Sequence, residues 1–550
     1  MTMSNADVAP RTNPAGNGKA RRGRVNSVLR RPLQRPELAS LGGLVAAFTV
    51  FTIMRPDLFL SQDNGINVTS LAAQYGIVAV GVTALMIAGH FDLSVGTIVG
   101  ALSGATTTRY IKQSVFGPLA EVGRMDVQRL DEVVAALAPR AFGVLRRLIA
   151  EPSTVGQETG AQEVLAAELQ QLGFDITRLM IPETIGSDPA AGVPSRSYAG
   201  RYDVVGERGD GRRSLVLNGH VDVVPAQDAD RWTSPPFEPT ERDGWLIGRG
   251  AGDMKGGFAA GLLALWALDE MAPGWLTGRL TVVSAIEEEC TGNGTLAAGR
   301  AGYTADAALL LEPTDLNVLL GGIGIIWVSI EVDGRAGHAE AALRSVNPIA
   351  AVPAVIAALQ QFEQQMNAAH LRGGDAAFSA LSHPYNVNVG TVHAGDWASS
   401  VPAVARLQVR VGHPGSWSSE ETLERVRAAV VEGIRSDQWL VEHPPRFALT
   451  GYRGQRHAQD PDAELVTQLS GAHASVFGRP PDQVMIGSTT DARFYVNQFG
   501  MPAVAYGPRT RNMHGTDEAV ELGSIVDCAR SVARFLADWF AADPVEKRLR

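Results

Sequence analysis

The sequence is poor in cysteine and has no excess of positive charge. Its only two cysteines, Cys290 and Cys528, lie far apart in 550 residues, without a CxxC or zinc-finger spacing. A disulfide framework is therefore not indicated, and two free thiols favour a reducing, cytoplasmic setting. The formal net charge is -10, and the absence of a basic surface of domain size argues against nucleic acid as a partner.

Length and composition predict several units. A chain of 550 residues exceeds what one hydrophobic core usually supports. Residues 1–37 are the first unit, and its stretch from Met1 to Arg35 holds basic side chains from Arg11 to Arg35 against a single acid, Asp7, among Pro, Gly, Asn and Ser. This composition cannot bury a core, so we expect a disordered basic tail.

Uncharged stretches follow the tail. Residues 38–54 and 65–89 carry no charge, and a third apolar stretch runs over 93–108. These lengths predict two or three membrane helices within residues 38–112. A signal peptide is the alternative for the first stretch, although no clean small-residue cleavage site follows it. The basic tail should stay cytoplasmic, so two spans would leave the rest of the chain in the cytoplasm and three would place it outside.

Part of this region resembles a transporter segment. Residues 75–105, YGIVAVGVTALMIAGHFDLSVGTIVGALSGA, resemble the permease subunits of ribose-type sugar ABC transporters, in which a helix runs into a Gly-x-x-Asp-Leu-Ser-Val-Gly turn, here 89–96. The likeness ends near residue 110, well short of the helices that a permease needs. It implies a fused or truncated permease fragment, and Met125 would be an alternative start of a soluble protein.

From residue 126 the pattern changes to alternating helices and apolar strands. Helical patterns at 127–150 and 256–271 alternate with apolar strands at 214–224, 280–286 and 306–313. Val- and Leu-rich strands between helices predict an α/β fold, with a mostly parallel sheet flanked by helices. The first part of this domain covers residues 126–322.

Residues 323–440 have a different pattern. Segments 325–334 and 407–412 alternate apolar and polar residues, as half-exposed antiparallel strands do, beside helical patterns at 348–366 and 419–434. This predicts an inserted α+β domain. Residues 441–550 return to the first pattern, so the α/β domain is expected to be discontinuous.

Acidic and histidine side chains occur where the predicted strands end. They are His220 and Asp222 after the first strand, Asp253 in the loop GRGAGDMKGG, Glu287, Glu288 and Glu289 after the strand 280–286, Glu312 after the next strand, and His514 after the strand 501–508. Alone, each has an ordinary explanation, such as a helix cap for Asp253 or a solvated surface for the glutamates. Together, carboxylates and imidazoles at the edge where open α/β sheets bind ligands suit zinc and related divalent ions.

The order of these motifs resembles the aminoacylase and carboxypeptidase family of co-catalytic zinc hydrolases, which includes acetylornithine deacetylase and succinyl-diaminopimelate desuccinylase. The likeness covers about residues 126–545. It implies two divalent ions, zinc or else cobalt or manganese, whose ligands are His220 and Glu312 on one ion, Glu289 and His514 on the other, and Asp253 between them. Asp222 would orient His220. Glu288 would be the general base that takes a proton from the activated water and returns it to the leaving amine.

The inserted domain contains GRAGHAE, which matches the family's histidine turn at His338. The resemblance implies a homodimer formed through residues 323–440, in which this histidine stabilises the oxyanion in the partner subunit's site. The alternative for His338 is a surface loop histidine.

Substrate-binding residues are less clearly marked. Where the family often has Asn before x-x-Pro and then an Arg on the strand, this chain has SSVP at 399–402 and Gly412, with Arg410 two residues earlier on the same strand face. Thr490 and Arg493, in IGSTTDARF, resemble the family's loop beside the site, and a structural Asp–Arg pair explains this motif equally well. The candidates for substrate contact are therefore Arg410, Ser399, Thr490 and Arg493.

The predicted function is hydrolysis of a linear amide bond, with removal of an acetyl, formyl or similar small acyl group from an amine or amino acid. The motifs SAIEEECTGNGTLAAG and GDWASSVP look closest to deacylases that include the formylaminopyrimidine deformylases, which need no substrate carboxylate. A metallo-carboxypeptidase or dipeptidase of the same fold is one alternative, and a membrane transport or solute-binding component is another. The enzyme part is expected in the cytoplasm, anchored to the membrane if residues 38–108 are real membrane helices.

Overall fold

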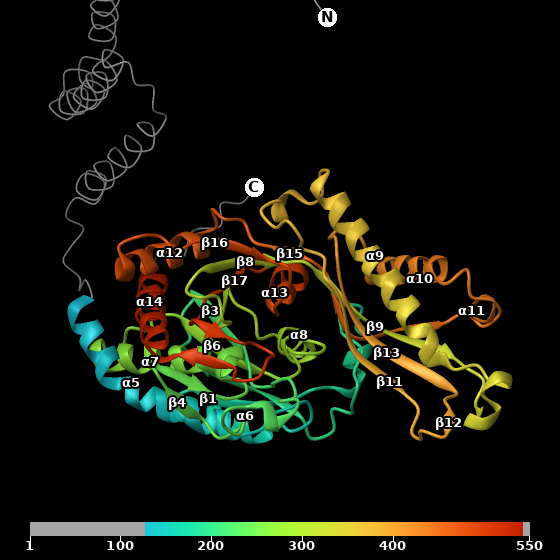
Figure 1. Cartoon of the computed structure of the whole chain (residues 1–550). Helices are drawn as coiled ribbons and strands as arrows, with labels where there is room; N and C mark the ends of the chain where they lie inside the picture. The colour runs from blue at the N-terminus through green and yellow to red at the C-terminus, as the bar shows by residue number, and fades with distance from the viewer. Residues whose placement is uncertain (1–126, 543–550) are drawn as a thin grey trace, which may run out of the picture. The chain divides into compact units, whose positions relative to one another are not determined.

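The computed structural model describes residues 127–542, and residues 1–126 and 543–550 are drawn as a grey trace (Figure 1). The predictions of a basic tail at 1–37, of membrane helices and a permease-like segment at 38–112, and of a start at Met125 therefore concern residues outside the described range. Within residues 127–542, no helix combines the length and the apolar character that crossing a membrane requires.

A nine-stranded sheet lies at the centre of the larger domain. Its order is β1-β2-β6-β3-β7-β17-β8-β15, with β16 also paired to β8. The strands are β1 (Asp175–Met180), β2 (Tyr202–Arg208), β3 (Ser214–His220), β6 (Arg279–Ala285), β7 (Ala308–Leu310), β8 (Val318–Gly322), β15 (His457–Ala458), β16 (Gln483–Ile486) and β17 (Ala503–Ala505).

The sheet is mixed, whereas the sequence pattern predicts a mostly parallel one. Strand β3 pairs in parallel with β6 and β7, β17 with β7, and β16 with β8. The pairs β1–β2, β2–β6, β17–β8 and β15–β8 are antiparallel. The prediction rested on the apolar strands β3, β6 and β7, which are the buried parallel centre, and the outer strands carry no comparable signal.

Helices cover both faces of this sheet (Figure 1). Residues Leu215 and Leu217 of β3 pack toward one helix layer and Val216 packs toward the other, as the two-residue period of a strand requires. The first layer holds α5 (Val127–Ala150), α6 (Thr159–Gln171), α7 (Gly256–Met271), α12 (Glu464–Phe477) and α14 (Leu522–Ala541). The second layer holds α8 (Asn293–Arg300) and α13 (Ala492–Phe499).

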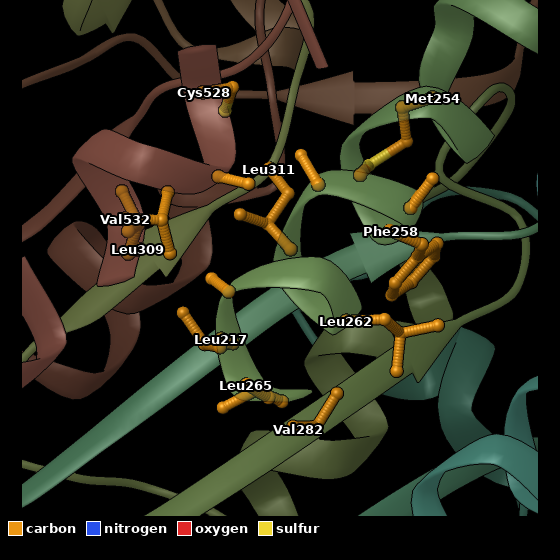
Figure 2. Packing of buried hydrophobic residues seen from close by; sticks show 14 of the residues in the cluster. Leu217, Met254, Phe258, Leu262, Leu265, Val282, Leu309, Leu311, Cys528 and Val532 are labelled. Carbon is orange, nitrogen blue, oxygen red and sulfur yellow. The ribbon is translucent and has the colours of Figure 1, made fainter. Parts of the chain in front are cut away.

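Helix α7 is the central helix of the first layer. Every residue from Gly256 to Leu268 is buried, as expected for a helix that is apolar on all sides. Figure 2 shows Leu262 and Leu265 of this helix beside Leu217 and Val282 of the sheet. Glycine allows the helix to begin this close, because a Cβ at Gly257 would lie 1.8 Å from the main-chain oxygen of Leu311. The start of α7 is thereby held against the chain segment that leads into Glu312.

The second domain is an antiparallel sheet in the order β11-β13-β9-β14. The strands are β9 (Gly324–Asp333), β11 (Val387–Ala394), β13 (Val404–His413) and β14 (Arg446–Gly454), and the helices are α9 (Val352–Leu371), α10 (Ser419–Gly433) and α11 (Gln438–Glu442). Alternate residues of β9, such as Val328 and Ile330, pack with α9 and α10. Because β14 pairs with β9, this domain continues to Gly454, past the predicted boundary at residue 440.

Two small strand groups complete the described part. Strands β18 (Thr510–Arg511), β19 (Ala519–Glu521), β5 (Trp245–Ile247) and β4 (Thr240–Arg242) form one sheet in this order. Strands β10 (Gly337–His338) and β12 (Ser400–Val401) pair with each other.

Candidate metal centre

The candidate ligands meet at the carboxyl edge of the parallel strands. His220 is the last residue of β3, Glu289 follows β6 and Glu312 follows β7. Since β3 is parallel to both neighbours, the three strands deliver these side chains to one edge. Asp253 lies in the turn Ala251–Lys255 that leads into α7, with a cis peptide bond to the next residue, and His514 lies in the loop between β18 and β19.

The five predicted ligands form two groups that share Asp253. In the first group, His220 Nε2 lies 3.1 Å from Asp253 Oδ1 and 3.8 Å from Glu312 Oε2. In the second, His514 Nε2 lies 3.0 Å from Glu289 Oε2 and 3.4 Å from Asp253 Oδ2. The candidate ligand atoms within each group all lie within 4.8 Å of one another. Each oxygen of Asp253 therefore faces a different group.

The donor atoms fit a divalent cation. Within residues 127–542, Glu312 Oε1 is buried and has no hydrogen-bond partner. His220 Nδ1 donates to the main-chain oxygen of Asp222 at 2.9 Å, so in the neutral ring Nε2 keeps its lone pair toward Asp253 and Glu312. Carboxylate oxygens with imidazole nitrogens suit zinc, manganese or cobalt better than the soft metals.

The pKa shifts of the acidic residues and of His514 at the site indicate that it lacks positive charge. Burial raises the pKa of Glu288 and Glu289, and it raises the pKa of Glu312 to about 8. The charge of Glu289, helped by Asp253, raises the pKa of His514 to about 11. A divalent cation in each group would supply the missing charge and favour the ionised carboxylates.

Asp222 organises the site through its main chain and its side chain. Its main-chain oxygen, and not its carboxylate, accepts the hydrogen bond from His220 Nδ1. The carboxylate oxygens lie 3.1 Å from the backbone N–H groups of Glu288 and Glu289, one on each. Asp222 thus ties the strand that carries His220 to the acidic loop.

Glu288 lies beside both groups without belonging to either. Its Oε2 lies 4.0 Å from His220 Nε2, and the side chain is 10% exposed. The Tyr452 hydroxyl donates to the main-chain oxygen of Glu288. A carboxylate held next to the ligands and facing a cavity has the placement that a general base needs.

Comparison with known proteins identifies the family. Residues 216–538 match the description "Peptidase family M20/M25/M40". Over 410 residues the chain is 32% identical to the succinyl-diaminopimelate desuccinylase of Methylorubrum populi. The alignment covers 72% of this chain and 97% of that relative. The chain belongs to peptidase family M20/M25/M40.

Further relatives agree with this M20-family membership. The N-formyl-4-amino-5-aminomethyl-2-methylpyrimidine deformylase of Bacillus subtilis is 29% identical, over 69% of this chain and 89% of that relative. Among solved structures, the dipeptidase Dug1p of Saccharomyces cerevisiae has a TM-score of 0.64 at 16% identity, covering 76% of this chain and 99% of that one. Human carnosine dipeptidase 1 has a TM-score of 0.60 at 15% identity, covering 76% and 100%. At these identities the solved structures support the fold alone.

The M20 family confirms the predicted class of enzyme, a metal-dependent hydrolase of linear amides. The predicted likeness to desuccinylases and formylaminopyrimidine deformylases is also confirmed. The permease-like segment precedes the matched residues 216–538 and stays a prediction.

A cavity of about 710 Å³ opens between the M20 site and the four-stranded sheet. Arg410 and Thr490 line it, together with Asp253, Glu288, Glu289, Glu312 and His514. Arg410 Nη2 lies 3.4 Å from the main-chain oxygen of Gly487 and 3.4 Å from Ser488 Oγ. Burial lowers the pKa of this guanidinium. The sequence candidate Arg410 is therefore a cavity residue without a carboxylate partner in the described range.

Three other sequence candidates lie away from this cavity. Arg493 pairs with Asp491 at 3.2 Å and donates to the main-chain oxygens of Thr490 and Thr291, which are the contacts expected of a structural Asp–Arg pair. Ser399 and His338 are exposed at the β10–β12 pair. Neither is among the described residues that line the cavity.

Two charged residues at the site were not singled out from the sequence. Arg249 and Glu518 form a buried ion pair behind the ligands. Their positions in the sequence could have pointed to them, because Arg249 lies four residues before Asp253 and Glu518 lies four residues after His514.

Proposed function

We propose that this chain is a two-metal amidohydrolase that removes a small acyl group from an amine or amino acid. The observation that carries the proposal is that Asp253 turns one oxygen to each of two ligand groups, His220 with Glu312 and Glu289 with His514. Zinc is the ion that these ligands suit best, with cobalt or manganese as substitutes. The two buried free cysteines fit a reducing compartment, so we place the enzyme part in the cytoplasm.

The chain's own residues would divide the reaction as follows. When bound, the two ions polarise the amide carbonyl and lower the pKa of water. Glu288 takes a proton from the attacking water as its oxygen bonds to the carbonyl carbon. The same carboxyl group then gives that proton to the amide nitrogen as the carbon–nitrogen bond breaks. The products are a carboxylic acid and an amine, which become a carboxylate and an ammonium ion when the acid's proton passes to the amine, and Glu288 returns to its starting state.

The substrate is proposed to lie in the cavity with its acyl group at the ligands. Arg410 is the only Arg or Lys among the described residues that line the cavity, and we assign to it the binding of one anionic group of the substrate. Trp327 and Tyr452, whose rings lie 5.7 Å apart, give the cavity an aromatic wall. Thr490 also lines the cavity and offers a hydroxyl to the substrate.

We further propose that the chain forms a homodimer through the second domain, with His338 serving the partner subunit's site. Support comes from large apolar side chains exposed around the β10–β12 pair. Leu343, Val392 and Trp397 expose 104%, 46% and 72% of their surface. Such exposure is typical of an interaction surface, and Ser399 would lie at the same surface.

The decisive experiment combines metal exchange with a base variant. Purified protein is treated with a chelator, reloaded with Zn²⁺, Co²⁺ or Mn²⁺, and assayed on N-formyl, N-acetyl and N-succinyl amines and on dipeptides. We expect activity to disappear with the metal and to return on reloading. Glu288→Gln should lower kcat by about 10²–10⁴-fold with unchanged metal content, whereas Glu270→Gln, an exposed control at the end of α7, should keep full activity.

Two outcomes would change the conclusion. Full activity of Glu288→Gln would remove the proposed base and with it the mechanism. Faster turnover of dipeptides than of acyl amines would assign the same site to a dipeptidase.

A further inference from the structure

A buried ion pair connects the loops that carry the proposed ligands. The side chains of Arg249 and Glu518 are each 1% exposed, and Arg249 Nη1 donates to Glu518 Oε2. Burying two charges costs free energy that their attraction repays only when further hydrogen bonds satisfy both groups. The partners of those further bonds indicate the purpose of the pair.

Glu518 holds the backbone of the shared ligand. Its Oε1 accepts hydrogen bonds from the backbone N–H groups of Gly252 and Asp253, both at 2.9 Å. The carboxylate therefore fixes the peptide units from which the Asp253 side chain projects. A shift of this loop would move both oxygens of Asp253, and so would disturb both ligand groups at once.

Arg249 holds the other two loops. Its Nη2 donates to the main-chain oxygen of Gly515 at 3.0 Å, directly after His514, and to that of Pro225 at 3.4 Å, three residues after Asp222. The guanidinium also lies 5.2 Å from the ring centre of Trp232. Planar guanidinium geometry allows one side chain to serve the carboxylate and two carbonyls together.

The loop around His514 needs such support. His514 has a φ of 61°, and Asn512 and Asp517 each have a φ of 55°. Non-glycine residues in this left-handed region are strained and persist only when surrounding contacts fix them. Among the described residues, the contacts of Arg249 with Gly515 and of Glu518 with Asp253 join this loop to the loop of the shared ligand.

We propose that Glu518 and Arg249 are positioning residues that hold Asp253 and His514 at the separation two metal ions require. This inference rests on the proposed two-metal function. This role goes beyond fold stability: without the pair, the chain still folds but binds metal ions weakly.

The test measures Zn²⁺ binding to the full chain by calorimetric titration after chelator treatment, together with kcat and KM. Glu518→Gln keeps one acceptor oxygen but turns an amide N–H₂ toward Arg249. Arg249→Lys keeps the charge opposite Glu518 but cannot reach both carbonyls. Each variant is expected to bind the weaker of two ions about 10–100-fold less tightly, with a lower kcat and a KM within about twofold of the parent, as expected when only the reacting geometry is disturbed.

The matched control is Glu464→Gln. Glu464 pairs at 2.5 Å with Arg213, whose side chain is 8% exposed, at the opposite end of β3 from His220. This variant loses an ion pair that lies away from the proposed ligands and in which Glu464 is 42% exposed, and it should bind two Zn²⁺ ions like the parent. The absorption spectrum of Co²⁺-loaded protein gives a second readout, expected to change in the site variants and not in the control.

The outcomes separate the two proposals. Parent-like Zn²⁺ affinity and Co²⁺ spectra in Arg249→Lys and Glu518→Gln would overturn the positioning role and leave the two-metal function intact. Equal weakening in Glu464→Gln would also overturn it, because metal binding would then follow stability. A parent chain that binds no Zn²⁺ would overturn both proposals. If Glu518→Gln fails to fold, Arg249→Lys decides.

Discussion

The three consecutive glutamates at 287–289 occupy three different environments. Glu287 is fully buried and accepts hydrogen bonds from Tyr198, Arg201 and Thr291, Glu288 faces the cavity, and Glu289 contacts His514. A φ of 63° at Glu287 turns the chain between the first and second of them. Strained backbone of this kind is often found at functional sites, where the surrounding structure holds it in place.

His457 should make the protein sensitive to acid. Burial lowers the pKa of His457 from 6.5 to about 3, and the charges of Arg493 and Arg456 add to this effect. Between pH 7 and pH 5 the unfolded chain takes up a proton on this histidine and the folded chain does not. The free energy of unfolding therefore decreases as the pH is lowered from 7 to 5, by about 2 kcal/mol from this group.

Thermal melts at the two pH values test this effect. His457→Gln should lose less melting temperature between pH 7 and pH 5 than the parent does, and the exposed His443→Gln should behave like the parent. An equal loss in the parent and in His457→Gln would show that other groups cause the acid sensitivity.

Arg410 should discriminate between substrates by charge. If it binds an anionic group, Arg410→Met should lower kcat/KM about 10–100-fold for acyl amines that carry a carboxylate, because a hydrogen bond to a charged group contributes about 1.5–3 kcal/mol. Neutral N-formyl amines should be affected far less. Steady-state kinetics on matched charged and neutral substrates measure the ratio, and Arg406→Met is the control, since Arg406 lies on the same strand but pairs with Glu331. A uniform loss on both substrates would argue against charge recognition.

At the scale of elements, the sequence predicts long helices and buried strands well and strand partners poorly. The predicted helices at 127–150 and 256–271 coincide with α5 and α7, because their composition and period are local properties. The antiparallel pairing of β2 with β6 and of β14 with β9 depends on contacts far apart in sequence. The segment of β14, RFALTGYRG, has a register shift between Thr450 and Arg453, which weakens its alternation and hides the domain boundary.

The same division applies to the candidate site. The ligand candidates could be chosen from the sequence because they are chemically distinctive residues at strand ends, arranged in the order of a known family. Glu518 and Arg249 could not, because they act through main-chain groups such as the Asp253 N–H and the Gly515 oxygen. Such contacts depend on how three loops meet, and no residue type marks them in advance.

The strand pair β10–β12 and its surroundings should form the dimer contact. Trp397→Asp is expected to shift the protein to a monomer, because burying a carboxylate in an apolar interface is strongly unfavourable. Met180→Asp is the control, since Met180 is 50% exposed on β1 in the other domain. Light scattering after size-exclusion chromatography measures the mass.

His338→Ala then separates assembly from catalysis. This variant should stay dimeric and lose about 10²–10³-fold in kcat, the usual effect of removing one oxyanion donor. A dimer that persists in Trp397→Asp, or full activity of His338→Ala, would contradict the proposed arrangement.

At the scale of the whole molecule, the two domains meet through short connections. Only Ile323 separates β8 from β9, and residues 455–456 separate β14 from β15. The cavity lies where the domains meet, with Glu288 from one side and Trp327 and Arg410 from the other. With the proposed roles, chemistry and substrate selection would be divided between the domains, and changes in the four-stranded sheet should alter specificity without touching the proposed ligands.

The catalytic unit should function without the first 124 residues. Every proposed ligand, the cavity and the hydrophobic clusters of the described part lie within residues 127–542, and a domain with its own core can fold alone. A chain of residues 125–550 is expected to fold, dimerise and hydrolyse the same substrate with a kcat/KM within about twofold of the full chain. Circular dichroism, chromatography and kinetics measure these properties, with Glu288→Gln in the short chain as the inactive control. An unfolded or inactive short chain would mean that residues before Met125 contribute to the enzyme, and would revive a role for the membrane-like segment in its function.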